Sequence, residues 1–359
     1  MLNQETEEKL ARILVQRIED INDSILKKIG NAIKQIANLT PTQAYQLAQI
    51  LKFGGSYEQI AKELARVSGK NVNDIYKIFD KVASDNKEFA KEFYKYRGID
   101  FIPYKKDLAL RNQVESIAKL TADTYRNISN TIGIGFLFED LSGQITFKNI
   151  QETYYDVIDR AVISISQGKE TYYTEMRRIM KQLGNSGLVL YDSGRTRRLD
   201  SAIRMNILDG IRQVSIETSR RFGAEYGANM VEVTHHQNSA PDHIDTVDGK
   251  QFARIDVIRR QIAHGIEKEI KLEDIVENKV KVKGKWYDDF DTINNNLKRK
   301  VGTLNCRHYE LNGILGITNP QYTERQIEED TKKNIEGFVY EGKHYTLYER
   351  NTIAKKIRA

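Results

Sequence analysis

Residues 10–36 read LARILVQRIEDINDSILKKIGNAIKQI, and their apolar side chains recur every three or four positions. This spacing places one apolar stripe along an α-helix and predicts a single helix that continues past Gly30. An amphipathic helix that cannot bury its stripe alone needs a neighbouring helix or another protein. We therefore predict that this helix docks on a partner through Ile18, Ile21 and Ile25.

Helical spacing also dominates the rest of the sequence up to about residue 230. Thr40 and Pro41 provide the N-cap and the first helical residue of a second helix. A helix pair is predicted over residues 57–67 and 72–82, because a Ser-Gly-Lys segment interrupts the pattern between them. Breakers are few, since the chain has only four prolines, at positions 41, 103, 241 and 320.

A different pattern begins near residue 186. Residues 188–191 predict a short strand and residues 192–194 a turn, and apolar spacing then predicts a helix from residue 199 to about residue 226. Three arginines crowd the start of this helix, where cations oppose the helix dipole, so we expect an acidic group beside them. These arginines are Arg195, Arg197 and Arg198. They form either a solvated charged turn or a contact surface, whose partner would be DNA phosphate or an acidic protein.

From residue 231 the chain changes to short runs with period two. Residues 231–233 predict a strand, and Asp248-Gly249 is a hairpin-type turn signal. Residues 280–287 alternate as one arm of a hairpin does, and residues 336–348 predict a hairpin around Glu341-Gly342. A basic segment of helical period follows over residues 349–359. The sequence thus predicts an α+β protein with an extended, mostly α-helical region, a small α+β domain, and a short tail with a hairpin and a helix. We place these parts at residues 1–185, 186–230 (a strand, turn and helix connector), 231–319 and 320–359.

The composition is that of a soluble protein with a dense charged surface, because 40% of the residues are hydrophobic and 30% are charged. The formal net charge of +6 permits contact with nucleic acid or an acidic partner, but 50 acidic residues argue against a strongly basic surface. A single cysteine cannot form an internal disulfide, which is typical of a reducing compartment. The sequence has no signal-peptide pattern and no apolar run of membrane-spanning length, so we expect a cytosolic assembly and no membrane partner.

All six histidines and the only cysteine fall between residues 235 and 344. Imidazole and thiolate are side chains that bind borderline metal ions and titrate near neutrality. One hypothesis is therefore a structural Zn²⁺ site, in which four ligands tie two distant loops together. Its ligands would be His236 (or His235), His243, Cys306 and His308.

Two other interpretations of these histidines and of the cysteine stay open. In the first they are catalytic, with Cys306 as a nucleophile beside a histidine base, or with His236 as the base of a nuclease. No carboxylate pair, oxyanion motif or glycine-rich phosphate loop accompanies them, which weakens this interpretation. In the second the histidines only form hydrogen bonds with the backbone of their loops.

Several of these motifs resemble the phage minor capsid protein 2 family. The resemblance is weak before about residue 184 and specific after it. This chain departs from the family where Asn238-Ser239-Ala240-Pro241 replaces Gly-Ala-Arg-Pro, and where Asp248 replaces a usual Gln. The segments that carry the resemblance are residues 191–195, 198–206, 231–236, 241–243, 249–250, 305–308, 322–323 and 345–349.

The resemblance implies a structural, non-enzymatic head-morphogenesis protein of a tailed phage at or near the portal vertex. It implies a helical region, residues 1–185, that docks on the portal protein and the major capsid protein. Contact with packaged DNA is a further option, which rests on the basic balance of the chain and on Arg195, Arg197 and Arg198. Multiple copies would lie in the virion, in the head interior or the neck, after assembly in the host cytoplasm, and would support head assembly or DNA packaging. The alternative function is a metal-dependent nuclease or other hydrolase in the His/Cys domain, which would need an open coordination position.

Overall fold

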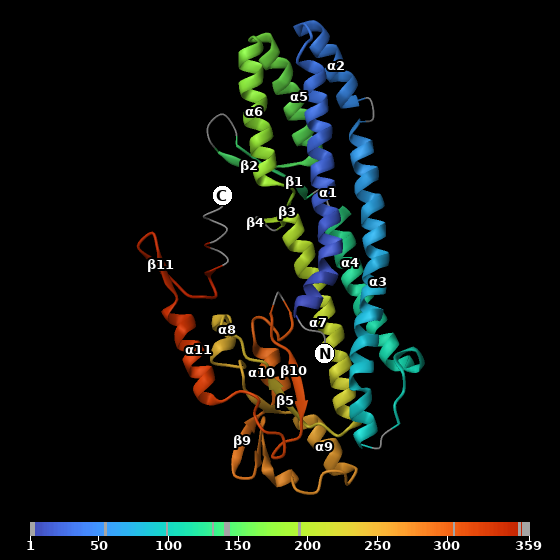
Figure 1. Ribbon diagram of the computed structural model, residues 1–359, viewed down its shortest axis with the longest axis vertical. Coiled ribbons are helices and arrows are strands. Elements are labelled where there is room, and N and C mark those ends of the chain that lie inside the picture. Colours follow the sequence, from blue (N-terminus) through green and yellow to red (C-terminus); the bar gives the residue numbers. More distant parts are fainter. Residues whose placement is uncertain are drawn as a thin grey trace. The chain divides into compact units, whose positions relative to one another are not determined.

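The computed structural model describes residues 4–53, 56–97, 100–130, 133–139, 144–192, 195–303, 306–350 and 353. The chain forms two compact units, and Figure 1 colours it along the sequence from blue to red. The helical unit comprises Asn3–Ile78 and Ala118–Leu208, and the mixed unit comprises Phe79–Ile117 and Asp209–Ala359. The helical content and the small sheets confirm the predicted α+β class, whereas the division into four parts stays a prediction.

The helical unit is built around α1 (Gln4–Ile36), which confirms the helix predicted over residues 10–36. Three further helices contact one another and α1, and Figure 1 shows α1, α5 and α6 running side by side. They are α2 (Pro41–Phe53), α5 (Ile150–Ser166) and α6 (Lys169–Ser186). As predicted, α2 begins at Pro41 after Thr40, whose hydroxyl accepts a hydrogen bond from the backbone N–H of Gln43.

The apolar stripe of α1 is used inside the helical unit. Ile18, Ile21 and Ile25 are at most 3% exposed, so this chain itself covers the face that we expected to dock. Full burial of an isoleucine stabilises a fold by roughly 1.5–3 kcal/mol. The stripe therefore stabilises the helical unit, and a docking surface on α1 has to use its exposed face.

The helix pair that we predicted over residues 57–67 and 72–82 is wrong, because α3 is one continuous helix, Ser56–Arg97. A glycine such as Gly69 destabilises a helix interior by about 1 kcal/mol relative to alanine. The buried side chains of Val67, Val72 and Ile75 on the same helix outweigh that cost. Packing thus overrides the local break signal. Together with α4 (Leu108–Asn130) and α7 (Leu199–Glu225), α3 contributes to both units.

The helical unit also contains an antiparallel sheet with the strand order β2-β1-β3-β4. Strand β3 confirms the strand predicted at residues 188–191, while the turn predicted at 192–194 lies mostly outside the described residues. Strands β1, β2 and β4 were not predicted from the sequence. Strands β1 and β2 pair so closely that a Cβ atom on Gly135 would lie 1.9 Å from the carbonyl oxygen of Lys148. The strands are β1 (Ile134–Glu139), β2 (Ile145–Asn149), β3 (Val189–Asp192) and β4 (Arg195–Arg198).

The mixed unit holds three small antiparallel sheets, with the orders β10-β5-β6, β7-β8-β9 and β11-β12. They confirm the strand predicted at residues 231–233 and the hairpin predicted at 336–348. The stretch predicted as one hairpin arm, residues 280–287, forms two paired strands with a turn between them. The basic segment predicted as helical, 349–359, lies mostly outside the described residues. The elements are β5 (Met230–Val233), α8 (Pro241–Ile244), β6 (Gln251–Ala253), α9 (Ile255–Ala263), β7 (Ile275–Val276), β8 (Lys279–Val282), β9 (Lys285–Asp288), α10 (Phe290–Asn296), β10 (Glu310–Gly313), α11 (Glu324–Glu336), β11 (Phe338–Tyr340) and β12 (Lys343–Tyr345).

Strand β5 lies at the centre of the mixed unit, with both faces covered. Met230 belongs to one apolar cluster with Val280, and Val231 belongs to a second cluster with Phe290. Successive side chains of a strand point to opposite faces, so this one strand joins the two clusters. The loops that leave β5 and enter β10 are therefore anchored to a rigid, buried sheet.

Candidate metal centre

Two loops at one end of the β5–β10 pair bring the predicted ligands together. His243 lies on the short helix α8, which follows β5, while Cys306 and His308 lie in the segment just before β10. Because β5 and β10 pair antiparallel, the residues after β5 lie beside the residues before β10. The sheet register therefore closes a separation of 63 positions between His243 and Cys306.

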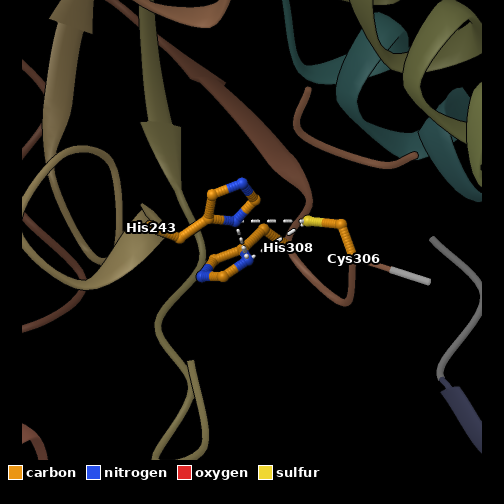
Figure 2. Close-up of side chains that lie close together, drawn as sticks. All are labelled: His243, Cys306 and His308. Carbon is orange, nitrogen blue, oxygen red and sulfur yellow. Dashed lines mark hydrogen bonds between the residues drawn. The ribbon is translucent and has the colours of Figure 1, made fainter. Parts of the chain in front are cut away.

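The three side chains point their ligand atoms at one another, as Figure 2 shows. The Nδ1 atoms of His243 and His308 are 3.3 Å apart, and Sγ of Cys306 lies 3.6 Å and 3.3 Å from them. Zinc–ligand bonds of normal length give tetrahedron edges of about 3.3 Å between two nitrogens and about 3.6 Å between nitrogen and sulfur. The triangle thus has nearly the dimensions of one face of a zinc tetrahedron.

The outer nitrogens of both imidazoles face acceptors. Nε2 of His243 lies 2.7 Å from the carbonyl oxygen of Arg299, and Nε2 of His308 lies 2.8 Å from Oδ1 of Asp248. Each Nε2 therefore carries a proton, and a neutral ring then has its lone pair on Nδ1. Nδ1 of His243, Nδ1 of His308 and the sulfur of Cys306 converge on one point, and a metal ion bound there would replace the proton that His308 carries on Nδ1. A carboxylate behind a ligating histidine is also a common outer partner in metal sites.

The cluster is nearly closed to solvent: His243, Cys306 and His308 are each at most 3% exposed. Burial raises the pKa of the Cys306 thiol, but hydrogen bonds from His243 and His308 outweigh it and bring the pKa to about 5. Burial lowers the pKa of His308, but its hydrogen bonds to Asp248 and Cys306 raise it to about 9. The sulfur is therefore a thiolate at neutral pH, the form that binds metal.

The fourth predicted ligand, His236, lies beside the triangle rather than in it. Its ring centroid is 4.5 Å from that of His308, with the two rings nearly perpendicular. One side of the ring forms a hydrogen bond with the backbone of Arg307, and Nε2 is buried with no partner among the described residues. Burial and then the neighbouring His308 lower its pKa to about 4, so the ring is neutral. The structure thus assembles three of the four predicted ligands and places a neutral, unpaired nitrogen next to them.

Sequence reasoning missed the part that Asp248 plays. Its carboxylate accepts hydrogen bonds from His308 and from the backbone N–H of His236, and it contacts Nδ1 of His235 at 2.8 Å. Gly249 follows with a φ of +69°, and a Cβ atom there would lie 2.5 Å from Ile327 of α11. Asp248-Gly249 therefore serves as the turn that carries the outer carboxylate, instead of a two-residue hairpin turn. The only sequence signal was that dipeptide, which did not reveal its neighbours.

The arginines predicted to contact DNA or an acidic partner lie in the helical unit. Arg195, Arg197 and Arg198 lie on β4, and the side chain of Arg195 is outside the described part of the chain. Arg198 forms a two-pronged ion pair with Asp200 at 3.2 and 3.3 Å, which is the acidic neighbour expected near the helix start. Arg197 is exposed and contacts the sulfur of Met205. A role in binding DNA or an acidic partner stays a prediction.

This architecture is that of a mostly helical α+β protein whose mixed unit contains a buried cluster of side chains that could hold a metal ion. A family model described as phage minor capsid protein 2 matches residues 2–358, and the chain therefore belongs to that family of structural phage head proteins. No curated protein and no solved structure matches it. Within the described residues, no helix is both long and apolar enough to span a membrane.

Proposed function

We propose that this protein is a minor head protein that sits at or near the portal vertex and contacts the portal protein and the major capsid protein. The observation that carries the proposal is the family match, which covers nearly the whole chain and makes the protein a structural component of the phage virion. In this role several copies assemble in the host cytoplasm, lie in the head interior or neck, and support head assembly or DNA packaging.

The exposed face of α1 is the docking surface that the burial pattern favours. Ile18, Ile21 and Ile25 are inside the helical unit, whereas Ile13 is 53% exposed. A single exposed apolar side chain is common on protein surfaces, so the proposal rests on the family match, and Ile13 is the residue at which this face is tested. We expect Ile13→Asp to leave the fold intact and to reduce binding to the portal protein.

The test is copurification with the portal protein and incorporation into heads, with Arg12→Asp as the matched control. Arg12 is also exposed, so the control adds a carboxylate one position away. Loss of incorporation in Ile13→Asp alone supports docking through this face. Equal incorporation of both variants rules the face out, and absence of the wild-type protein from purified heads rules out the proposed role.

The ion that the triangle fits best is zinc in a structural role. The donor set of one thiolate and two imidazoles suits zinc, and both imidazoles are oriented by hydrogen bonds from behind. A rotation of the His236 ring that points its unpaired Nε2 toward the triangle supplies the fourth ligand of a tetrahedral site. A closed site of this kind ties the loop after β5 to the segment before β10 and lowers the free energy of the folded mixed unit.

The alternative, a metal-dependent nuclease or other hydrolase, requires substrate to reach the cluster. Cys306, His308 and Asp248 resemble a Cys-His-Asp arrangement, but the side chains are 3% exposed or less. We expect no turnover of DNA, RNA or peptide substrates with Mg²⁺, Mn²⁺ or Zn²⁺ present. Activity that disappears in Cys306→Ala or His236→Ala would make the hydrolase the better assignment.

A further inference from the structure

A second polar site of the mixed unit lies between the C-terminal end of α7 and the helix α9. The two elements enclose a pocket of about 260 Å³, separate from the His/Cys cluster. Four arginines line it: Arg220 and Arg221 from α7, Arg254 just before α9, and Arg260 within α9. A concave site with several guanidinium groups is suited to an anion with more than one oxygen.

Two of the lining arginines, Arg220 and Arg254, share one buried carboxylate, which we call the base of the pocket. Glu310 is 1% exposed and accepts hydrogen bonds from Nε and Nη2 of Arg220 at 2.8 and 2.7 Å, and from Nη2 of Arg254 at 2.7 Å. Burial and the neighbouring Arg220 both act to lower the pKa of Arg254. Glu310 alone does not neutralise both cations, and Asp291 supplies a second negative charge that acts on them.

Among the described residues, Arg260 is the lining arginine without a carboxylate partner. Arg221 is paired with Asp107, while Arg260 is exposed and donates only to the backbone oxygen of Asp256 among the described residues. One carboxylate, Glu217, lines the wall and accepts a hydrogen bond from Gln113. Asp291 acts on Arg220 and Arg254 electrostatically, without a hydrogen bond to either in the described chain.

Several donors of these arginines are also without an acceptor. In the part of the chain that the structure describes, Nη1 of Arg220 and both Nε and Nη1 of Arg254 have no protein partner. Arg220 is 32% and Arg254 11% exposed at the side chain, so solvent or a ligand reaches them. A tetrahedral anion offers oxygens in several directions, and this matches donors that come from α7 on one side and α9 on the other.

We propose that this pocket binds a phosphate group, either as free phosphate or as part of a nucleic-acid backbone. The inference goes beyond the proposed role in the head, because it does not depend on the portal, the capsid or the metal centre. Arg220 and Arg254 hold the phosphate from the base of the pocket, and Arg260 holds it from the rim. Glu310 keeps these two guanidinium groups in place through its hydrogen bonds to both.

The test uses the full-length protein and isothermal titration with inorganic phosphate. Arg260→Gln removes the rim cation at an exposed position, so the fold should survive, and Arg259→Gln is the matched control on the same helix. Arg259 is exposed as well and does not line the pocket. Because a hydrogen bond to a charged group contributes about 1.5–3 kcal/mol, Arg260→Gln should weaken phosphate binding by about tenfold or more. Arg259→Gln should bind phosphate like the wild type.

A second variant, Val257→Glu, places a carboxylate in the pocket wall and should also abolish binding. Adding a DNA duplex distinguishes the sources: competition with phosphate that weakens as salt rises identifies a nucleic-acid backbone, and no competition identifies free phosphate. The proposal is overturned if the wild type binds no phosphate at millimolar concentration. It is also overturned if Arg260→Gln and Val257→Glu bind phosphate as tightly as Arg259→Gln does.

Discussion

If Cys306 ligates a metal ion as proposed, its removal should destabilise the mixed unit in a way that is measurable and specific. The ligands His243 and Cys306 are 63 positions apart, so a metal ion between them closes a long loop. The chain-entropy relation for a cross-link of that length gives about 4 kcal/mol. For a unit of this size that corresponds to a fall in melting temperature of about 8–16 °C.

The assay compares wild type, Cys306→Ser and the control His264→Ala by thermal unfolding and by elemental analysis. His264 is exposed and lies outside the cluster, so its loss should change neither zinc content nor melting temperature. Wild type should contain close to one zinc per chain, and Cys306→Ser should contain almost none. Chelation of the wild-type zinc should reproduce the lower melting temperature of Cys306→Ser.

Two hydrogen-bond chains predict where the effect will spread. His308 connects through Asp248 to His235, which reaches Asp330 of α11 at 3.2 Å. His243 connects through the carbonyl of Arg299, whose guanidinium donates to the hydroxyl of Tyr348 after β12. Metal removal should therefore increase hydrogen exchange in α11 and the β11–β12 hairpin. If zinc-free wild type melts and exchanges like the zinc-loaded protein, the reasoning is refuted and the cluster is only a set of packed side chains.

Three further outcomes follow from the packing of the two units. Ile18→Asp with Ile25→Asp should lower helicity and solubility in circular dichroism before any binding is tested, because each change places a charge in the core at a cost of about 3 kcal/mol or more; a soluble, fully helical double mutant would contradict this. Lys87→Met should reduce the free energy of unfolding by about 1–3 kcal/mol in denaturant titrations, since it removes a buried cation from Asp107 while Arg221 still pairs with that carboxylate; an unchanged midpoint would show that the contact of Lys87 with Asp107 is dispensable. Asp74→Asn should lower stability by less than about 1 kcal/mol at neutral pH, because the hydrogen bond from an arginine on α1 holds the pKa of Asp74 below its usual range. A carboxyl group with a folded-state pKa below its unfolded-state pKa stabilises the fold at pH values above the unfolded pKa. It loses that contribution as the pH falls through the folded pKa, so the free energies of unfolding of wild type and Asp74→Asn should converge in acid.

The sequence by itself determined the features that depend on neighbours along the chain. Apolar spacing over residues 10–36 and 199–226 predicted α1 and α7, because the period of a helix is written in consecutive residues. The hairpin around Glu341-Gly342 was predictable for the same reason, since both residues adopt positive φ in a tight turn between β11 and β12. The chemistry of the candidate site was also visible, because histidine and cysteine are rare enough that two short clusters stand out.

Only the tertiary structure decided which residues meet. It joined α3 across Gly69, because burial of apolar side chains along the helix outweighs the conformational cost of one glycine. It turned the stripe of α1 inward, which a periodic pattern cannot distinguish from a stripe that faces another protein. It assembled His243 with Cys306 and His308 and placed Asp248 behind them, since the antiparallel register of β5 and β10 joins segments that are distant in sequence. Such contacts depend on the packing of the whole unit, and no local pattern of residues records them.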